Sequence, residues 1–250
     1  MIIKKNARAY SALFTALLIA VFVGERAYAQ GSVKINQYRL TSPKARLMTR
    51  FRAPQKSAGL AQQIAIAISD LSFDTLQSNI SVTTTQRSDV KQNTVWSGTF
   101  YWKRSEDDDR WFRIKFKDSG PDILIKGVEV KVYVPKINKI IETSLQTVMD
   151  KYPMYYFDPT EMLTGNYDLK LLPKRGGYTA IKAVPKEPGD TEYIIMSVTK
   201  VNGNYFPMKF EIVQKTVTRT IVLSNVKQPE ELDDSLFQFN YPNAASMPIR

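Results

Sequence analysis

The segment from Thr94 to Lys139 decides how this chain folds, and it reads TVWSGTFYWKRSEDDDRWFRIKFKDSGPDILIKGVEVKVYVPKINK. Three runs in it alternate, or nearly alternate, between apolar and polar side chains: Val95–Arg104, Trp111–Lys117 and Val128–Pro135. Each run is bounded by charged residues, Gly or Pro. Because side chains on a strand point alternately to opposite faces, the pattern predicts three consecutive antiparallel strands.

The three predicted strands share one apolar and largely aromatic face. Its members are Trp96, Gly98, Phe100, Trp102, Arg104, Phe112, Ile114, Phe116, Val128, Val130, Val132 and Val134. The opposite face is polar and mostly basic. An apolar sheet face must be covered, so we expect the rest of the chain to supply a cover.

Composition narrows the function classes. The 250 residues include neither Cys nor His, which excludes disulfides and thiol nucleophiles and removes the commonest general base and metal ligand. We therefore expect no cofactor, no metal and no catalytic residue. An enzyme that uses Asp, Glu, Lys, Ser or Tyr is not excluded. The net charge is +11, but the basic residues are scattered among acids, so nucleic acid is not expected as a partner.

The N-terminus has the pattern of an export signal. Lys4, Lys5 and Arg8 precede the apolar run Tyr10–Val23, and Ala27-Tyr28-Ala29 resembles a small-residue cleavage site. The apolar run is shorter than the roughly 20 residues of a membrane span, although an uncleaved anchor stays open. We expect residues 1–29 to be removed after Ala29 and the mature protein to reach a periplasm.

A polar leader and one helix precede the strands. Residues 30–56 are basic and without periodic pattern, which predicts a flexible leader or an edge strand. Residues 57–71 predict a helix with Ser57 as N-cap. Its apolar stripe consists of Leu60, Ile64, Ile68 and Leu71.

Strand patterns then continue to the C-terminus. Besides the three strands above they cover Ile80–Gln86, Ile137–Ser144, Tyr167–Leu172, Tyr178–Val184, Thr191–Lys200, Tyr205–Gln214, Thr216–Ser224 and Leu236–Tyr241. Residues 145–165 break the pattern and predict one or two short helices rich in Met and aromatic side chains. We expect one mainly β (α+β) domain over residues 57–250, with about eleven strands and two or three helices. A single sheet of this width must curl.

Several segments, in this order, resemble the family of LolA-type outer-membrane lipoprotein carriers. They are Ser97–Arg104, Trp111–Ile114, Gly127–Ile140, Ala183–Lys186 and Phe237–Pro242. Three positions depart from the family pattern: Ser105 replaces a Pro, Lys126 replaces an Asp, and Asn202-Gly203 replaces a longer turn. Glu106–Asp109 adds an acidic hairpin, most simply a solvated tip. These departures do not change the predicted fold, but they leave undecided how the lid is latched.

The resemblance implies an incomplete antiparallel barrel whose concave face is covered by helices. It also implies a periplasmic carrier that receives lipoproteins from an inner-membrane ABC transporter or lipid-export pump. The carrier would shield their acyl chains and pass them to an outer-membrane acceptor. A monomer is expected. Three alternatives stay open: a carrier of another lipid or amphiphile, a sensor that binds an anti-sigma partner, and an enzyme.

A carrier needs an apolar cavity that can open. The residues expected to line it are Phe100, Trp102, Phe112, Ile114, Val130, Val132, Leu60, Ile64, Ile68, Leu71, Met149, Met154 and Met162. Met suits this role because its flexible side chain repacks around chains of varied shape. Arg104 shares the face of Phe100 and Trp102 at the strand end. It is either a latch that donates hydrogen bonds to a lid helix or a solvated hairpin residue.

Overall fold

Twelve strands form one sheet in the computed structural model, which describes residues 59–69, 73–89, 93–105, 109–147, 166–175, 177–201 and 203–248. The strands are β1 (Thr75–Gln86), β2 (Asn93–Arg104), β3 (Arg110–Phe116), β4 (Asp122–Lys126), β5 (Glu129–Val134), β6 (Lys139–Ser144), β7 (Tyr167–Arg175), β8 (Tyr178–Pro185), β9 (Thr191–Val201), β10 (Asn204–Gln214), β11 (Val217–Lys227) and β12 (Ala245–Pro248). The other elements are helix α2 (Leu60–Ser69) and the short 3-10 helices η1 (Pro135–Ile137) and η4 (Asp234–Phe237). The predicted signal peptide and leader lie outside the described residues.

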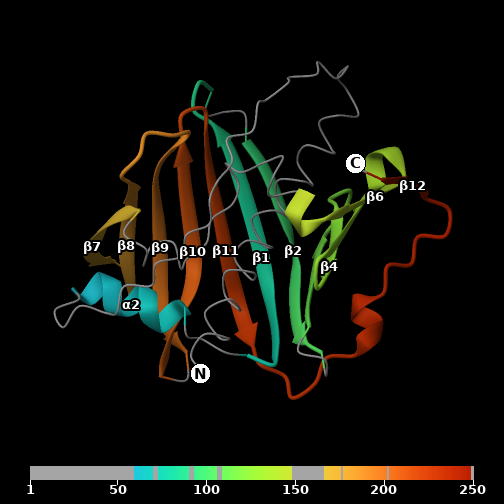
Figure 1. Cartoon of the computed structure of the whole chain (residues 1–250), viewed down its shortest axis with the longest axis horizontal. Coiled ribbons are helices and arrows are strands. Elements are labelled where there is room, and N and C mark those ends of the chain that lie inside the picture. The colour runs from blue at the N-terminus through green and yellow to red at the C-terminus, as the bar shows by residue number, and fades with distance from the viewer. Residues whose placement is uncertain are drawn as a thin grey trace.

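The sheet is open. Its strand order is β12-β6-β5-β4-β3-β2-β1-β11-β10-β9-β8-β7, so β12 and β7 are its two edges (Figure 1). Neighbouring strands pair antiparallel except β12, which runs parallel to β6. The predicted fold class, a curved sheet that stops short of a closed barrel, is confirmed. Within the described ranges, no helix has the length and hydrophobicity that crossing a membrane requires.

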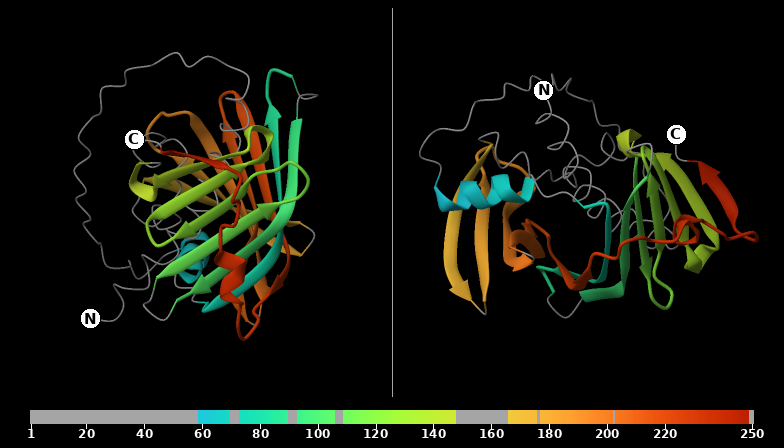
Figure 2. Two further views of the ribbon diagram at one scale, coloured as in Figure 1. Left: turned by 90° about the vertical axis from the view of Figure 1, so that its right-hand side faces the viewer. Right: turned by 90° about the horizontal axis from the view of Figure 1, so that it is seen from below.

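The sheet bends into two walls, one of β2–β6 and one of β7–β10, with β1 and β11 between them (Figure 2). Gly98 marks a place where two strands approach closely. A Cβ added there would lie 2.3 Å from the backbone oxygen of Lys115 on β3. Glycine in a strand interior is typical of such close approaches and of barrel corners. The absence of a side chain at Gly98 therefore lets β3 lie close against β2.

Alternation is confirmed along β2, β3 and β5. Their inward side chains are buried, as Phe100, Ile114 and Val132 illustrate, each at most 2% exposed. Val128 is the exception, because it is 70% exposed in the turn between β4 and β5. Gly127, which precedes it, has φ +54°, and this left-handed conformation turns the chain before β5 begins. The prediction that Val128 shares the apolar face is wrong.

Strand β4 was not predicted from the sequence. Its residues Asp122–Leu124 and Ile125 are all buried, so the run shows no alternation. Both faces are covered: Ile123 lies in the concave core, whereas Leu124 packs in a second cluster on the convex face. A strand covered on both faces loses the period of two by which strands are recognised.

The predicted strand Leu236–Tyr241 is wrong. Its first residues belong to η4, which Asp233 caps by accepting a hydrogen bond from the Ser235 backbone N–H. The guanidinium of Arg113 donates to the carbonyls of Leu236 and Gln238, at 2.7 and 2.9 Å. Those carbonyls are the groups a sheet ladder would use. The alternating aromatic residues pack on the convex face of the sheet instead of extending it.

Helix α2 is shorter than the predicted helix over 57–71. The carbonyl of Gly59 accepts hydrogen bonds from the backbone N–H groups of Gln62 and Gln63, so the first turn starts there. The buried residues of α2 are Ala61, Ile64, Ala65 and Ile68. Leu60 is 51% exposed and is not part of this buried stripe, while Ser57 and Leu71 lie outside the described residues.

Candidate ligand-binding face

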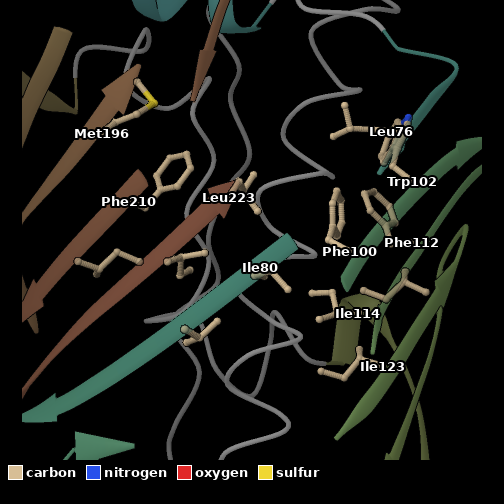
Figure 3. Packing of buried hydrophobic residues seen from close by; sticks show 14 of the residues in the cluster. Leu76, Ile80, Phe100, Trp102, Phe112, Ile114, Ile123, Met196, Phe210 and Leu223 are labelled. Atoms are coloured by element: carbon tan, nitrogen blue, oxygen red, sulfur yellow. The ribbon is translucent and has the colours of Figure 1, made fainter. Parts of the chain in front are cut away.

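The predicted aromatic side chains lie close together on the concave face of β2–β5. Phe100, Trp102, Phe112 and Ile114 are between 1% and 4% exposed and lie next to one another (Figure 3). The rings of Trp102 and Phe112 meet edge to face with centroids 4.3 Å apart, and those of Phe100 and Phe112 are 6.5 Å apart. Val130 and Val132 continue the face on β5, fully buried.

The opposite wall presents a second apolar surface that was not predicted as part of the site. Met196 on β9, Phe210 on β10 and Leu223 on β11 are buried, and their side chains lie on the same side of the sheet as Phe100 (Figure 3). One continuous cluster joins both walls. Strand alternation could have found these residues, because Phe210, Ile212, Ile221 and Leu223 follow the same period of two.

Helix α2 lies on a different part of the sheet from the one we expected. It packs against β10 and β7, so Ile64 and Ile68 cover that wall rather than the aromatic wall of β2 and β3 (Figure 2). The prediction that this helix faces Phe100 and Trp102 directly is wrong. Sequence periodicity identifies the apolar stripe of a helix but not the strand against which it packs.

Phe73 connects the two walls at one end of the sheet. Its backbone carbonyl accepts a hydrogen bond from the indole N–H of Trp102, at 3.1 Å. Its ring lies 5.7 Å from that of Phe206 on β10. Phe73 therefore fixes the orientation of Trp102 while it packs against the far wall.

Arg104 lies at the strand end, as predicted, with its side chain 28% exposed. Its Nη1 is 3.6 Å from a carboxylate oxygen of Asp74, and its backbone N–H donates to the Asp74 carbonyl. Residues 145–147 begin a helical turn, but the rest of the segment 145–165, for which short helices are predicted, lies outside the described residues. The same holds for Met149, Met154 and Met162. The latch therefore stays a prediction.

A few polar side chains interrupt the apolar concave face. Ser78, Thr84, Gln214 and Arg219 are each less than a tenth exposed. On β11 the residues with this orientation are Val217, Arg219, Ile221 and Leu223, so a single arginine stands in an otherwise apolar row. The same alternation in the sequence could have revealed Arg219, which we had not singled out.

The convex face carries a buried ion pair. The guanidinium of Arg113 donates to both carboxylate oxygens of Asp122, from Nε at 2.9 Å and from Nη2 at 2.5 Å. The hydroxyl of Tyr241 donates to the same carboxylate at 2.5 Å, and its ring stacks on that of Tyr133 with centroids 3.7 Å apart. The C-terminal segment is thus held to the sheet by directed contacts.

These contacts shift two pKa values. Burial, followed by the hydrogen bond to Asp122 and its negative charge, raises the pKa of Tyr241 above its ordinary value. For Arg113, burial acts to lower the pKa, but the hydrogen bond to Asp122 and its charge outweigh burial and raise it. The network therefore favours a neutral tyrosine beside a charged arginine.

The arrangement of side chains on the concave face suits contact with apolar groups. Its inward side chains are aromatic and aliphatic, with the few polar groups named above. Among the described residues, no three acidic side chains come together in a way that could hold a metal ion.

The sequence matches the family model described as "Outer membrane lipoprotein carrier protein LolA" over residues 71–240. No curated protein is significantly similar to the chain in sequence.

Solved structures with a similar arrangement come from several bacteria. A DUF1329 family protein from Desulfovibrio piger is 13% identical, with 71% of this chain and 95% of that chain aligned and a TM-score of 0.44. An uncharacterized conserved protein from Thermus thermophilus is 16% identical, with coverages of 76% and 99% and a TM-score of 0.48. A LolA superfamily protein from Nitrosomonas europaea is 16% identical, with coverages of 74% and 100% and a TM-score of 0.41. At such identities and scores these structures add no functional argument.

Proposed function

Because the chain belongs to the LolA family of outer membrane lipoprotein carrier proteins, we propose that it carries acyl chains through the periplasm. In this proposal the concave face binds the acyl chains of lipoproteins released from the inner membrane by an ABC transporter or a lipid-export pump. The protein then delivers them to the outer membrane, where an acceptor takes them over. It acts as a monomer and without catalysis, after cleavage of its signal peptide behind Ala29.

The observation that carries the proposal is the continuous apolar surface of the concave face. Aromatic side chains of β2 and β3 and aliphatic side chains of β9–β11 contribute to one cluster. Each CH₂ group of an acyl chain that leaves water contributes about 0.8 kcal/mol. Affinity for a long chain is therefore easily reached, and exchange of the cover is the harder requirement.

The part of α2 that covers the concave face consists of small and aliphatic side chains, Ala61, Ile64, Ala65 and Ile68. Such contacts are non-directional, and acyl chains can replace them without leaving polar groups unpaired. We propose that α2, the segment over 145–165 and Arg104 form the removable cover, with Arg104 as its latch. An Arg104→Leu variant should keep the fold and retain cargo that the wild type releases, as measured by transfer of a palmitoylated peptide to an acceptor membrane.

The central test places a charge on the concave face. In Phe100→Arg the guanidinium would occupy the apolar surface, so we expect loss of fatty-acyl binding, measured by displacement of a fluorescent fatty acid. Thr99→Arg is the matched control, because Thr99 is the neighbouring residue on the opposite face of β2. Circular dichroism checks that both variants keep the sheet.

Equal binding by wild type and a folded Phe100→Arg variant would contradict the proposed site. Mass spectrometry of material that co-purifies with the wild type addresses the cargo. Lipid-modified protein in the eluate supports the lipoprotein carrier, whereas free lipid alone favours a carrier of other amphiphiles.

A further inference from the structure

Ser78 is a polar residue among apolar side chains on the concave face. On β1 it stands between Leu76 and Ile80, and its partner on β2 is Phe100. These three neighbours are at most 2% exposed and point to the concave side of the sheet (Figure 3). Because residues two apart on a strand share a face, the side chain of Ser78 points to the same side.

The hydroxyl of Ser78 is buried and has no hydrogen-bond partner within the part of the chain that the structure describes. Most buried polar side-chain atoms in folded proteins have a partner, because an unpaired one gives up its hydrogen bonds to water without replacing them. The hydroxyl of Thr75 donates to the carbonyl of Pro229, and the indole N–H of Trp102 donates to that of Phe73. Of these three donors, only the Ser78 hydroxyl remains available to a ligand.

The ladder between β1 and β11 is irregular beside Ser78. Gln77 and Asn79 are two positions apart on β1, whereas their partners on β11, residues 227 and 224, are three positions apart. The extra residue makes a bulge, and Asn225 within it has φ +51°, in the left-handed region. Bulges are frequent beside functional sites, where they reorient side chains or end strand pairing. A bulge and an unpaired hydroxyl thus coincide on the concave face.

The chemistry of the hydroxyl indicates which ligand group fits. A serine hydroxyl is neutral and donates one hydrogen bond. A carboxylate would bring an unpaired charge onto this apolar surface at a high cost, whereas a neutral carbonyl brings none. Acyl chains in esters and amides end in such a carbonyl. Residues directly opposite each other on neighbouring strands have Cβ atoms about 5 Å apart, so a chain packed on Phe100 has its carbonyl within reach of Ser78.

We propose that the hydroxyl of Ser78 donates a hydrogen bond to the ester or amide carbonyl of an acyl chain bound on the concave face. This inference rests on the proposed function, because it assumes that acyl chains bind this face once its cover is displaced. It narrows the cargo to acyl esters and amides, and it names the residue that selects them over ether lipids and hydrocarbons.

The position of Ser78 also gives the bound chain a direction. Ser78 is the fourth residue of β1 and lies near the end of the sheet that carries Arg104. From there the apolar face continues toward the opposite end through Ile80 and Val82 on β1 and Ile114 on β3. The hydrocarbon therefore lies along β1 toward Val82, and the group that is joined to the acyl carbonyl leaves the face on the side of Arg104.

A purely structural role of the small side chain is the competing explanation. In that case serine occupies this position because a larger side chain does not fit beside Phe100, and its hydroxyl makes no contact with the ligand. The two explanations differ in one observable. Only a hydroxyl that bonds to the carbonyl distinguishes an acyl ester from an ether of similar shape.

The experiment compares 1-palmitoylglycerol with 1-O-hexadecylglycerol, which share the headgroup and the chain length and differ in the carbonyl. Both compete with diphenylhexatriene, a fluorescent probe without hydrogen-bonding groups, and the affinity of each variant for the probe is measured separately. Ser78→Ala should weaken binding of the ester about threefold to tenfold, as expected for one hydrogen bond, and leave binding of the ether unchanged.

Ser81→Ala is the matched control. Ser81 lies on the same strand but on the opposite face, where its partner on β2 is Ser97. It should leave the ratio of the two affinities unchanged. If Ser81→Ala changes this ratio as much as Ser78→Ala, loss of a serine from β1 acts indirectly and the contact is refuted.

A second measurement observes the carbonyl itself. A hydrogen bond lowers the stretching frequency of an ester carbonyl. The infrared band of bound 1-palmitoylglycerol, labelled with carbon-13 at the carbonyl, should therefore move to higher frequency when the wild type is replaced by Ser78→Ala.

The remaining outcomes are also decisive. An unchanged ratio of the two affinities in Ser78→Ala, or a carbonyl band that does not move, overturns the contact but leaves the acyl carrier intact. Equal weakening of ester and ether in Ser78→Ala assigns a structural role to the residue. If the wild type binds neither ligand, the acyl-carrier proposal itself fails.

Discussion

The two faces of the wall formed by β2–β5 are covered in different ways. The concave face is lined by aromatic and aliphatic side chains. The convex face is covered by the chain after β11, which is held by hydrogen bonds from Arg113 and by the carboxylate of Asp122 as well as by apolar contacts. Lys103 adds a further contact by donating to the Leu232 carbonyl at 2.9 Å.

The difference indicates which of the two faces has a cover that can be exchanged. Apolar contacts require no particular partner, so another apolar group can replace them at little cost. A buried ion pair loses several kcal/mol when one member is removed, because the other charge remains in the interior. We infer that the C-terminal segment is a permanent part of the fold and that the concave face is the one suited to exchange.

The largest effect is expected from Asp122→Ala, which tests whether the convex cover depends on its buried ion pair. The change leaves the guanidinium of Arg113, whose side chain is 11% exposed, without its carboxylate. We expect the free energy of unfolding to fall by about 3–5 kcal/mol in urea denaturation. Glu192→Ala breaks the exposed pair with Arg87 and should cost less than about 1 kcal/mol. If Asp122→Ala lowered the free energy of unfolding as little as Glu192→Ala, the convex network would be dispensable for stability.

A smaller effect is expected from Gly98→Ala, which tests the close contact of β2 and β3. The added methyl group would meet the backbone of β3 at 2.3 Å, so the strands must move apart. We expect a loss of about 1–3 kcal/mol in the free energy of unfolding, as for overpacked sites. Gly189→Ala is the control, because an added Cβ there meets no atom within 4 Å. An unchanged midpoint for Gly98→Ala would contradict the described geometry.

The smallest effect concerns pH and Tyr241. Its pKa is raised in the folded protein, so the contribution of Tyr241 is fully present below the ordinary tyrosine pKa of about 10. As the pH rises above that value, the unfolded chain loses the proton first and the stability falls. Tyr241→Phe should cost about 1 kcal/mol at pH 7 and should reduce the alkaline loss.

Denaturation of the wild type and Tyr241→Phe at pH 8 and pH 11 measures this difference. An identical alkaline loss in both proteins would mean that other groups cause it.

Much of the sheet could be predicted from residue alternation. The strands β2, β3 and β5 were predicted nearly at their observed bounds, because one of their faces is apolar and the other polar. The period fails where both faces are covered, so β4 was missed. Alternation predicts a strand wrongly where aromatic residues pack on the sheet without joining it, as Phe237 and Phe239 do.

The candidate site could be predicted only in part. The residues of the aromatic wall follow from alternation, and Phe100, Trp102, Phe112 and Ile114 lie where expected. The strands on which α2 packs could not be predicted, because a helix with one apolar stripe fits any apolar surface. Alternation places Arg219 on the apolar face of β11, but only the neighbouring strands show that its side chain is buried.

The sequence by itself determined the mainly β character of this protein and the aromatic face between Thr94 and Lys139, whereas the open sheet was expected only from the family resemblance. These properties depend on local periodicity, which each segment carries without the others. The tertiary structure alone decided which faces are covered, by which segments and through which contacts. That outcome depends on residues far apart in the chain, such as Asp122 with Tyr241, or Arg104 with Asp74. Local sequence carries no record of their distance in space.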